Sequence, residues 1–277
     1  MLKQRVITAI VLALVFLSVL FGLSATHFSW FVALVVLVGA WEWANLSSFS
    51  KSWQRAGYTG LIALLLWGVS DYSGVASGQL QGVHIQSLLL VACGWWALAL
   101  LLVQGYPSSA ILWGHPLLRL AMGILVLVPT WLALAYVRFQ PQGAWLLLLI
   151  IGVVAAADIG GYFSGRRFGK HKLAAAVSPG KTLEGFLGGF CANLLLAIII
   201  ADVTDSNLWL LLAVVIPTSL FSVLGDLLES MVKRHAGVKD SGTILPGHGG
   251  ILDRVDSITA AAPVFALAIL ASGWHLG

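Results

Sequence analysis

The chain has 277 residues, of which 59% are apolar and only 9% are Asp, Glu, Lys or Arg, and its mean hydropathy is +0.95. A soluble domain carries about 25% charged residues, so this composition excludes a water-soluble globule. The formal net charge of +4 fits the excess of Lys and Arg in the inside loops of membrane proteins, so nucleic acid is not an expected partner. We predict an all-α, polytopic integral membrane protein.

Nine apolar runs follow one another along the chain, and each predicts a transmembrane helix because about 20 apolar residues cross a bilayer. They cover 6–24, 28–46, 58–70, 86–104, 117–137, 144–160, 185–201, 208–226 and 257–274. The run at 58–70 is short, so eight spans is the alternative. With nine spans and a cytoplasmic N-terminus, fourteen of the fifteen Lys and Arg lie inside and only Arg138 lies outside. Eight spans would export both basic loops of the second half, so charge placement favours nine.

Charged residues are concentrated in the second half of the chain. Residues 151–256 hold nine of the eleven carboxylates and nine of the fifteen Lys and Arg. We interpret 1–150 as a transmembrane scaffold in contact with lipid, with no constellation that resembles a site. Residues 151–277 form the predicted catalytic region of the same membrane domain. The polar stretches are too short for a separate nucleotide-binding fold, so we expect the active site at the cytoplasmic ends of the C-terminal helices.

The first polar segment runs from Asp158, at the end of a predicted span, to Gly185. It contains five cations, several glycines and a predicted Ser-Pro helix start at 178–179. Lys and Arg side chains with the amides of a helix N-terminus are typical of a polyphosphate site. The alternative is a basic inside loop that only sets topology and touches anionic lipid. Gly-Lys-Thr at 180–182 is not a P-loop, because the required earlier glycine is Ala175. Gly185 and Gly189 have the spacing of a close helix contact.

The second polar segment combines carboxylates at two helix ends with a glycine-rich loop. On a helix, Asp226, Glu229, Ser230 and Lys233 share one face. Acidic residues recur where the last span begins, and the connecting loop contains Pro-Gly-His-Gly-Gly at 246–250. Hard oxygen ligands that converge with cations can hold Mg²⁺ and phosphates. A solvated, salt-bridged loop is the alternative, but it gives no reason for carboxylates at both membrane boundaries.

At these residues the sequence resembles the phosphatidate cytidylyltransferases, also called CDP-diacylglycerol synthases. The family signature is S-x-x-K-R, K-D, a small residue, P-G-H-G-G and D-R-x-D. It is matched by Ser230, Lys233, Arg234, Lys239, Asp240, Gly242, Pro246, Gly247, His248, Gly249, Gly250, Asp253, Arg254 and Asp256. The resemblance covers roughly 150–260, and the earlier residues match only in being apolar spans.

The resemblance implies that CTP and phosphatidic acid become CDP-diacylglycerol and pyrophosphate, with Mg²⁺ as cofactor and a monovalent cation such as K⁺ as a candidate companion. Asp226 and Asp253 resemble the metal-holding acidic pair. The predicted catalytic set is Asp226, Asp253, Lys233, Asp240 and Asp256. The predicted CTP set is Asp158, Lys170, Lys172, Ser178, Lys181, Thr182 and Glu184. The predicted set for the lipid phosphate is Ser230, Lys233, Arg234, Lys239, His248 and Arg254.

Two other function classes fit parts of the sequence. A transferase of phospho-alcohols would use Asp and Mg²⁺, but its D-G-x-x-A-R motif is absent. A cation-coupled transporter would also carry buried carboxylates, although near the bilayer midplane rather than at the inner ends of spans. The small size of the chain predicts an enzyme of the bacterial inner membrane, with cytoplasmic active-site loops, and an organelle form is the alternative. A homodimer is left open by the sequence.

Overall fold

The computed structural model describes residues 2–245 and 247–274, with side chains from residue 7 onward. Pro246 of the signature is therefore outside the described residues, as are the side chains of Lys3 and Arg5. The helices are α1 (Leu2–Gly22), α2 (Ala25–Leu46), α3 (Ser52–Ser73), α4 (Gly82–Gln104), α5 (Ala110–Trp113), α6 (Pro116–Phe139), α7 (Gly143–Phe168), α8 (Leu183–Thr204), α9 (Leu208–His235) and α10 (Leu252–Ser272). A hairpin of β1 (Lys172–Ala174) and β2 (Ser178–Thr182) joins α7 to α8.

Each predicted apolar run coincides with one long helix, so the all-α prediction is confirmed. Among the described residues, seven helices are long and apolar enough to cross a membrane: α2, α4, α6, α7, α8, α9 and α10. Within the residues whose side chains are described, α1 contributes the apolar stretch Ile7–Gly22, and α3 is not among the seven although it has 22 residues. The chain is a membrane protein, and nine crossings remain a prediction.

Two helices of the second half extend beyond their predicted ends. The run at 144–160 is the start of α7, which continues to Phe168, and the run at 208–226 continues in α9 to His235. Asp158 therefore lies inside α7 and not at its end, which corrects the sequence interpretation. The two extensions are polar. An apolar run marks only the apolar part of a helix, so it ends before the helix does.

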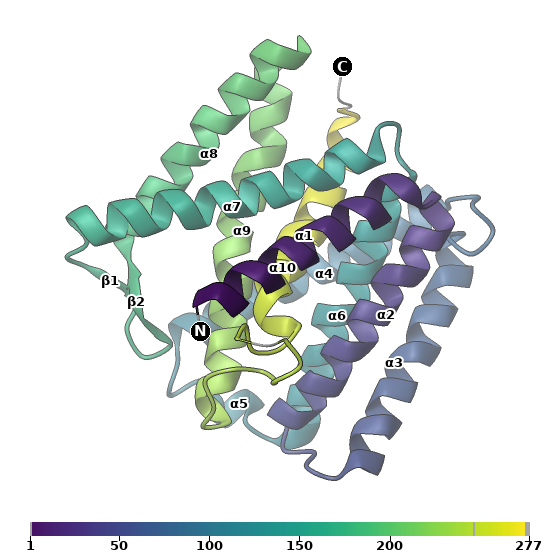
Figure 1. Ribbon diagram of the computed structural model, residues 1–277. Helices are drawn as coiled ribbons and strands as arrows, with labels where there is room; N and C mark the ends of the chain where they lie inside the picture. The colour runs from purple at the N-terminus through teal and green to yellow at the C-terminus, as the bar shows by residue number, and fades with distance from the viewer. Residues whose placement is uncertain (1, 246, 275–277) are drawn as a thin grey trace.

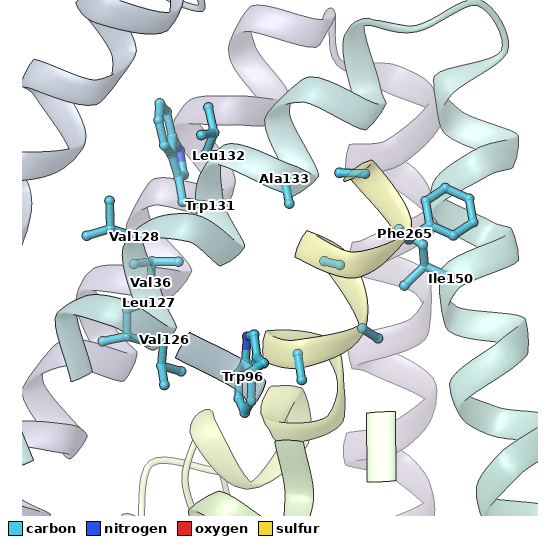
Figure 2. Close-up of a cluster of buried hydrophobic side chains, with 14 of the residues drawn as sticks. Val36, Trp96, Val126, Leu127, Val128, Trp131, Leu132, Ala133, Ile150 and Phe265 are labelled. Carbon is cyan, nitrogen blue, oxygen red and sulfur yellow. The ribbon is translucent and has the colours of Figure 1, made fainter. Parts of the chain in front are cut away.

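The core lies where α10 packs against α9, α6, α4 and α7. Figure 2 shows Phe265 of α10 beside Ile150 of α7, with Trp96 of α4 below. All three are at most 1% exposed. A buried hydrogen bond also joins α6 to α10, since the Thr130 hydroxyl donates to the carbonyl oxygen of Thr259 at 3.0 Å. This packing fixes the first turn of α10 relative to the C-terminal end of α9.

Helices α7 and α8 approach closely through small residues. A Cβ atom on Gly189 would lie 2.5 Å from the carbonyl oxygen of Ala157, and one on Gly185 would lie 2.8 Å from that of Gly161. Only glycine permits this approach of the two backbones. The predicted helix contact at Gly185 and Gly189 is confirmed.

Several connections between helices meet at one end of the bundle. Figure 1 shows the α2–α3 connection, α5 and the loop between α9 and α10 along the lower side, with the hairpin below the end of α7. Two contacts tie this end together. Arg119 donates to the carbonyl oxygen of Leu46 at 2.6 Å, and the rings of Trp113 and His235 lie 4.8 Å apart. The basic connections therefore share one side of the molecule, as the predicted topology requires.

Candidate functional site

Asp253, in the first turn of α10, organises the loop that precedes it. Its Oδ1 accepts a hydrogen bond from Lys233 Nζ at 2.7 Å. Its Oδ2 accepts from the backbone N–H groups of Ser241 at 2.9 Å and Gly250 at 2.8 Å. Gly249 has a φ of +81°, and a Cβ there would lie 2.6 Å from Oδ2. The signature glycines thus allow the loop to close on this carboxylate.

Lys233 is buried between carboxylates of two helices. Its side chain contacts Asp253 and also Glu229, at 3.3 Å, one turn earlier in α9. Lys233 is 8% exposed and Glu229 is 3% exposed. Asp256, one turn into α10, lies near enough to both residues for their charges to interact. The shared face predicted for α9 is confirmed, and it packs against the acidic start of α10.

Asp226 and Lys181 bring the two polar segments together. Lys181 Nζ lies 2.6 Å from Asp226 Oδ2. Ser230 donates its hydroxyl to the other oxygen of Asp226 at 3.1 Å. Asp158 of α7 interacts electrostatically with Lys181 and Asp226, and Asp256 interacts with Asp226. Residues from α7, β2, α9 and α10 therefore share one charged cluster.

The hairpin corrects the predicted helix start at Ser178-Pro179. Ser178–Thr182 is a strand paired with β1, and α8 begins only at Leu183, capped by the Thr182 hydroxyl, which accepts from the Gly185 N–H at 3.1 Å. A Ser-Pro pair favours a helix start locally, but strand pairing outweighs this preference here. Thr182 rather than Ser178 supplies the N-cap.

Glu184 holds the beginning of the hairpin. Its carboxylate accepts from the Lys170 N–H at 3.0 Å and from the His171 N–H, and it lies 2.6 Å from the His171 ring. Lys172 donates to the carbonyl oxygen of Pro179 at 2.8 Å. Lys170 and Lys172 are exposed, so this segment presents two cations to the surroundings of the protein.

One cavity of about 340 Å³ opens among α7, α8, α9 and β2. Asp158, Arg166 and Lys181 line its polar part, whereas Phe186 and Phe190 line its apolar part. The cavity combines charge at the end of the bundle with apolar walls between helices. Of the predicted CTP set, Asp158, Lys181 and Thr182 line it.

A second cavity, of about 610 Å³, follows the loop between α9 and α10. Lys239, Asp240, His248 and Arg254 of the predicted sets line it. Among the described residues, none lines both cavities. Arg234 lies elsewhere, where it donates to the carbonyl oxygen of Val177 at 3.4 Å. Asp158 and Lys181 therefore line one cavity, whereas Lys239, His248 and Arg254 line another.

Glu42 of α2 is a site residue that the sequence interpretation missed. It is 2% exposed, and it accepts hydrogen bonds from the Ser241 hydroxyl at 3.0 Å and from the N–H groups of Ile251 and Leu252 at 3.0 and 2.9 Å. Residues 1–150 therefore contribute a side chain that contacts the signature loop. A carboxylate inside an apolar run was the available signal, since such residues are usually functional.

Comparison with known proteins shows to which family the chain belongs. The family model described as "Cytidylyltransferase family" matches residues 3–271. The chain belongs to the cytidylyltransferase family. It is 43% identical to a phosphatidate cytidylyltransferase of Pseudomonas aeruginosa over 277 residues, covering 99% of both chains. It is 42% identical to that of Haemophilus influenzae, covering 96% of this chain and 98% of the relative, and 34% identical to that of Staphylococcus haemolyticus, covering 97% and 99%.

The carboxylate cluster of this cytidylyltransferase has the chemistry of a cation site. It contains two lysines, Lys181 and Lys233, and five acidic residues: Asp158, Asp226, Glu229, Asp253 and Asp256. In the described part of the chain, no three His, Cys, Asp or Glu side chains are placed to hold one metal ion. Mg²⁺ usually takes only one or two protein carboxylates and completes its shell with water and phosphate oxygens. The oxygen-rich, negatively charged cluster therefore fits Mg²⁺ that arrives with a phosphate substrate.

Proposed function

We propose that the chain transfers CMP from CTP to phosphatidic acid, which yields CDP-diacylglycerol and pyrophosphate. The observation that carries the proposal is the Lys181–Asp226 ion pair, because it joins the hairpin to the carboxylate cluster at one end of an otherwise apolar bundle. The names of the relatives, all phosphatidate cytidylyltransferases, agree with it. A lipid phosphate and a nucleotide from water would meet at this boundary.

In the proposed step, a phosphate oxygen of the lipid attacks the α-phosphorus of CTP. A new phosphoanhydride bond forms there, while the bond from the α-phosphorus to the bridging oxygen of the β-phosphate breaks and pyrophosphate leaves. The phosphate oxygen is itself the nucleophile, so the reaction requires no Ser, Cys or His nucleophile. The enzyme must align two polyanions and offset their charge.

Asp226 and Asp253 are the proposed metal-holding residues. Bound Mg²⁺ would supply charge neutralisation and orientation of the phosphates. Asp226 is held by Lys181 and Ser230, and Asp253 by Lys233 and loop N–H groups, so both carboxylates are oriented before substrate arrives. Asp253 would exchange one of these donors when it coordinates an ion. K⁺ remains a proposed companion ion.

The basic side chains are proposed to form two groups, one that binds the triphosphate of CTP and one that binds the phosphate of the lipid. Lys170, Lys172 and Lys181, with the hairpin around them, would hold the triphosphate, and Arg234 and Arg254 would hold the lipid phosphate. Lys233 is engaged by Asp253 and Glu229, so its proposed contribution is to orient Asp253 beside that phosphate. The remaining predicted residues, among them Ser178, Thr182, Lys239, Asp240, His248 and Asp256, keep supporting roles in this proposal.

The proposed location is the inner membrane of a bacterium, with the charged end of the bundle in the cytoplasm. Support comes from the charge distribution, since Lys and Arg gather on the side that faces the cytoplasm in membrane proteins. CTP and Mg²⁺ are also found on that side. The acyl chains of phosphatidic acid would stay in the bilayer beside α7, α8 and α9.

Pyrophosphate release tests the proposal. Detergent-purified protein should release pyrophosphate only when CTP, phosphatidic acid and Mg²⁺ are all present, and Asp253→Asn should lose the activity. The same protein in sealed vesicles should show no cation flux driven by an ion gradient. Folded protein without pyrophosphate release but with such flux would overturn the proposal in favour of a cation-coupled transporter.

A further inference from the structure

We infer that Glu42 is a positioning residue for the transfer reaction, which holds the signature loop and the start of α10 in their active arrangement. This inference rests on the proposed function for its catalytic part. Glu42 belongs to α2, about 200 residues before the loop that it contacts. Its role is to join the first half of the chain to the site.

Glu42 provides the N-terminal cap that α10 lacks in its own sequence. The N-cap residue Ile251 has no capping side chain. Instead, Glu42 Oε1 accepts from the N–H of Ile251 and Oε2 accepts from that of Leu252. A carboxylate at this place also interacts favourably with the positive end of the helix dipole. Among the described residues no Lys, Arg or His forms an ion pair with Glu42, so these N–H groups and one hydroxyl stabilise its buried carboxylate.

Glu42 and Asp253 share one hydroxyl. Ser241 Oγ lies 3.0 Å from Glu42 Oε2 and 3.0 Å from Asp253 Oδ2. A hydroxyl has one proton, so it can donate to only one of these carboxylates at a time. When it donates to Glu42, Asp253 keeps two backbone donors and Lys233 but gains freedom to accept another ligand. Glu42 therefore acts on Asp253 through Ser241.

Two signature glycines fit around the Glu42 carboxylate. A Cβ on Gly242 would lie 2.5 Å from Glu42 Oε1, and the three nearest atoms to it all belong to Glu42. A Cβ on Gly250 would lie 2.2 Å from Ser241 Oγ and 2.5 Å from Glu42 Oε2. Neither glycine has a left-handed backbone conformation. Close packing against Glu42, rather than the backbone conformation, therefore explains why both positions are glycine.

The first experiment compares Glu42→Gln with Asp71→Asn in the purified full-length protein. Asp71 is the other carboxylate of the first 150 residues and is exposed, so it is a matched control. A glutamine side chain has one acceptor oxygen, so it can replace only one carboxylate oxygen of Glu42 as the acceptor for these two N–H groups. Its NH₂ group would face the other N–H group, which is also a donor. We expect Glu42→Gln to lower kcat roughly 10- to 100-fold, with the KM for both substrates nearly unchanged.

A second measurement on the same proteins does not depend on catalysis. Hydrogen exchange of backbone amides in 240–253 should become at least roughly tenfold faster in Glu42→Gln and stay unchanged in Asp71→Asn. Glu42→Asp should recover part of both effects, since it keeps the charge. Unchanged exchange and unchanged kcat in Glu42→Gln would overturn the inference. If wild-type protein lacks transferase activity, the proposed function fails, while the exchange result still reports on Glu42.

A double substitution separates positioning from general loss of folding. Gly242→Ala should lower kcat in wild-type protein because the new methyl group meets Glu42. In the Glu42→Ala background the same change should have little further effect, because the atoms that it would meet are gone. An equal loss from Gly242→Ala in both backgrounds would contradict the proposed contact.

Discussion

Lys233→Met gives the sharpest prediction for the energetics of the cluster. Methionine keeps the apolar length of the lysine side chain and removes its charge. In the wild-type protein this charge lies 2.7 Å from Asp253 and 3.3 Å from Glu229, and it also interacts with Asp256. The substitution would leave three buried or half-buried carboxylates close together without their shared cation.

The size of the effect follows from that arrangement. Removing one partner of a buried ion pair costs about 3–5 kcal/mol, because the remaining charge stays buried without compensation. For a chain of this size, such a loss lowers the apparent Tm by roughly 6–20 °C. Lys233→Arg, which keeps the charge in a bulkier group, should lose less. Lys51→Met, at an exposed position, should change stability by less than about 0.5 kcal/mol.

The assay is thermal unfolding of each variant in the same detergent, followed by far-UV circular dichroism, together with pyrophosphate release below the lowest Tm. We expect Lys233→Met to be both less stable and inactive. A Tm within 2 °C of wild type, a margin of about 1 kcal/mol or less, would refute the view that Lys233 compensates the cluster.

Two further substitutions test the hairpin and the α7–α8 contact. Lys181→Met should raise the KM for CTP by at least roughly tenfold with a smaller change for phosphatidic acid, measured by steady-state kinetics, since loss of one charge-assisted contact costs about 1.5–3 kcal/mol. A rise confined to the KM for phosphatidic acid would reassign the hairpin to the lipid. Gly189→Ala should destabilise by about 1–3 kcal/mol, because its methyl group would meet the Ala157 carbonyl oxygen at 2.5 Å, whereas Gly68→Ala, in open space, should not destabilise. Equal melting temperatures for the two alanine variants would contradict the close contact.

The sequence predicted those parts of the fold and site that depend on local pattern. Apolar runs located the long helices, and helical spacing placed Asp226, Glu229 and Lys233 on one face. The predicted CTP and catalytic sets drew on both polar segments, and the Lys181–Asp226 pair joins these two segments. These features follow from periodicity and from the cost of charge in an apolar environment.

The parts that could not be predicted depend on tertiary contacts. Glu42 gains its role only when α2 packs against the start of α10, a contact between residues some 200 positions apart. The strand at Ser178–Thr182 exists because it pairs with β1, which overrides the local preference of Ser-Pro. Local pattern carries no information about which distant segment will supply a partner.

The most direct test of the proposed reaction follows the two ends of the triphosphate separately. Purified protein would receive CTP labelled at the α-phosphate in one sample and at the γ-phosphate in another, with phosphatidic acid and Mg²⁺, and the lipid would then be extracted. We predict that the α-label moves into the lipid while the γ-label stays in water as pyrophosphate, and that Asp226→Asn abolishes both the labelling of the lipid and the release of pyrophosphate. A γ-label in the lipid, or no label in the lipid although the protein is folded, would contradict the proposed reaction.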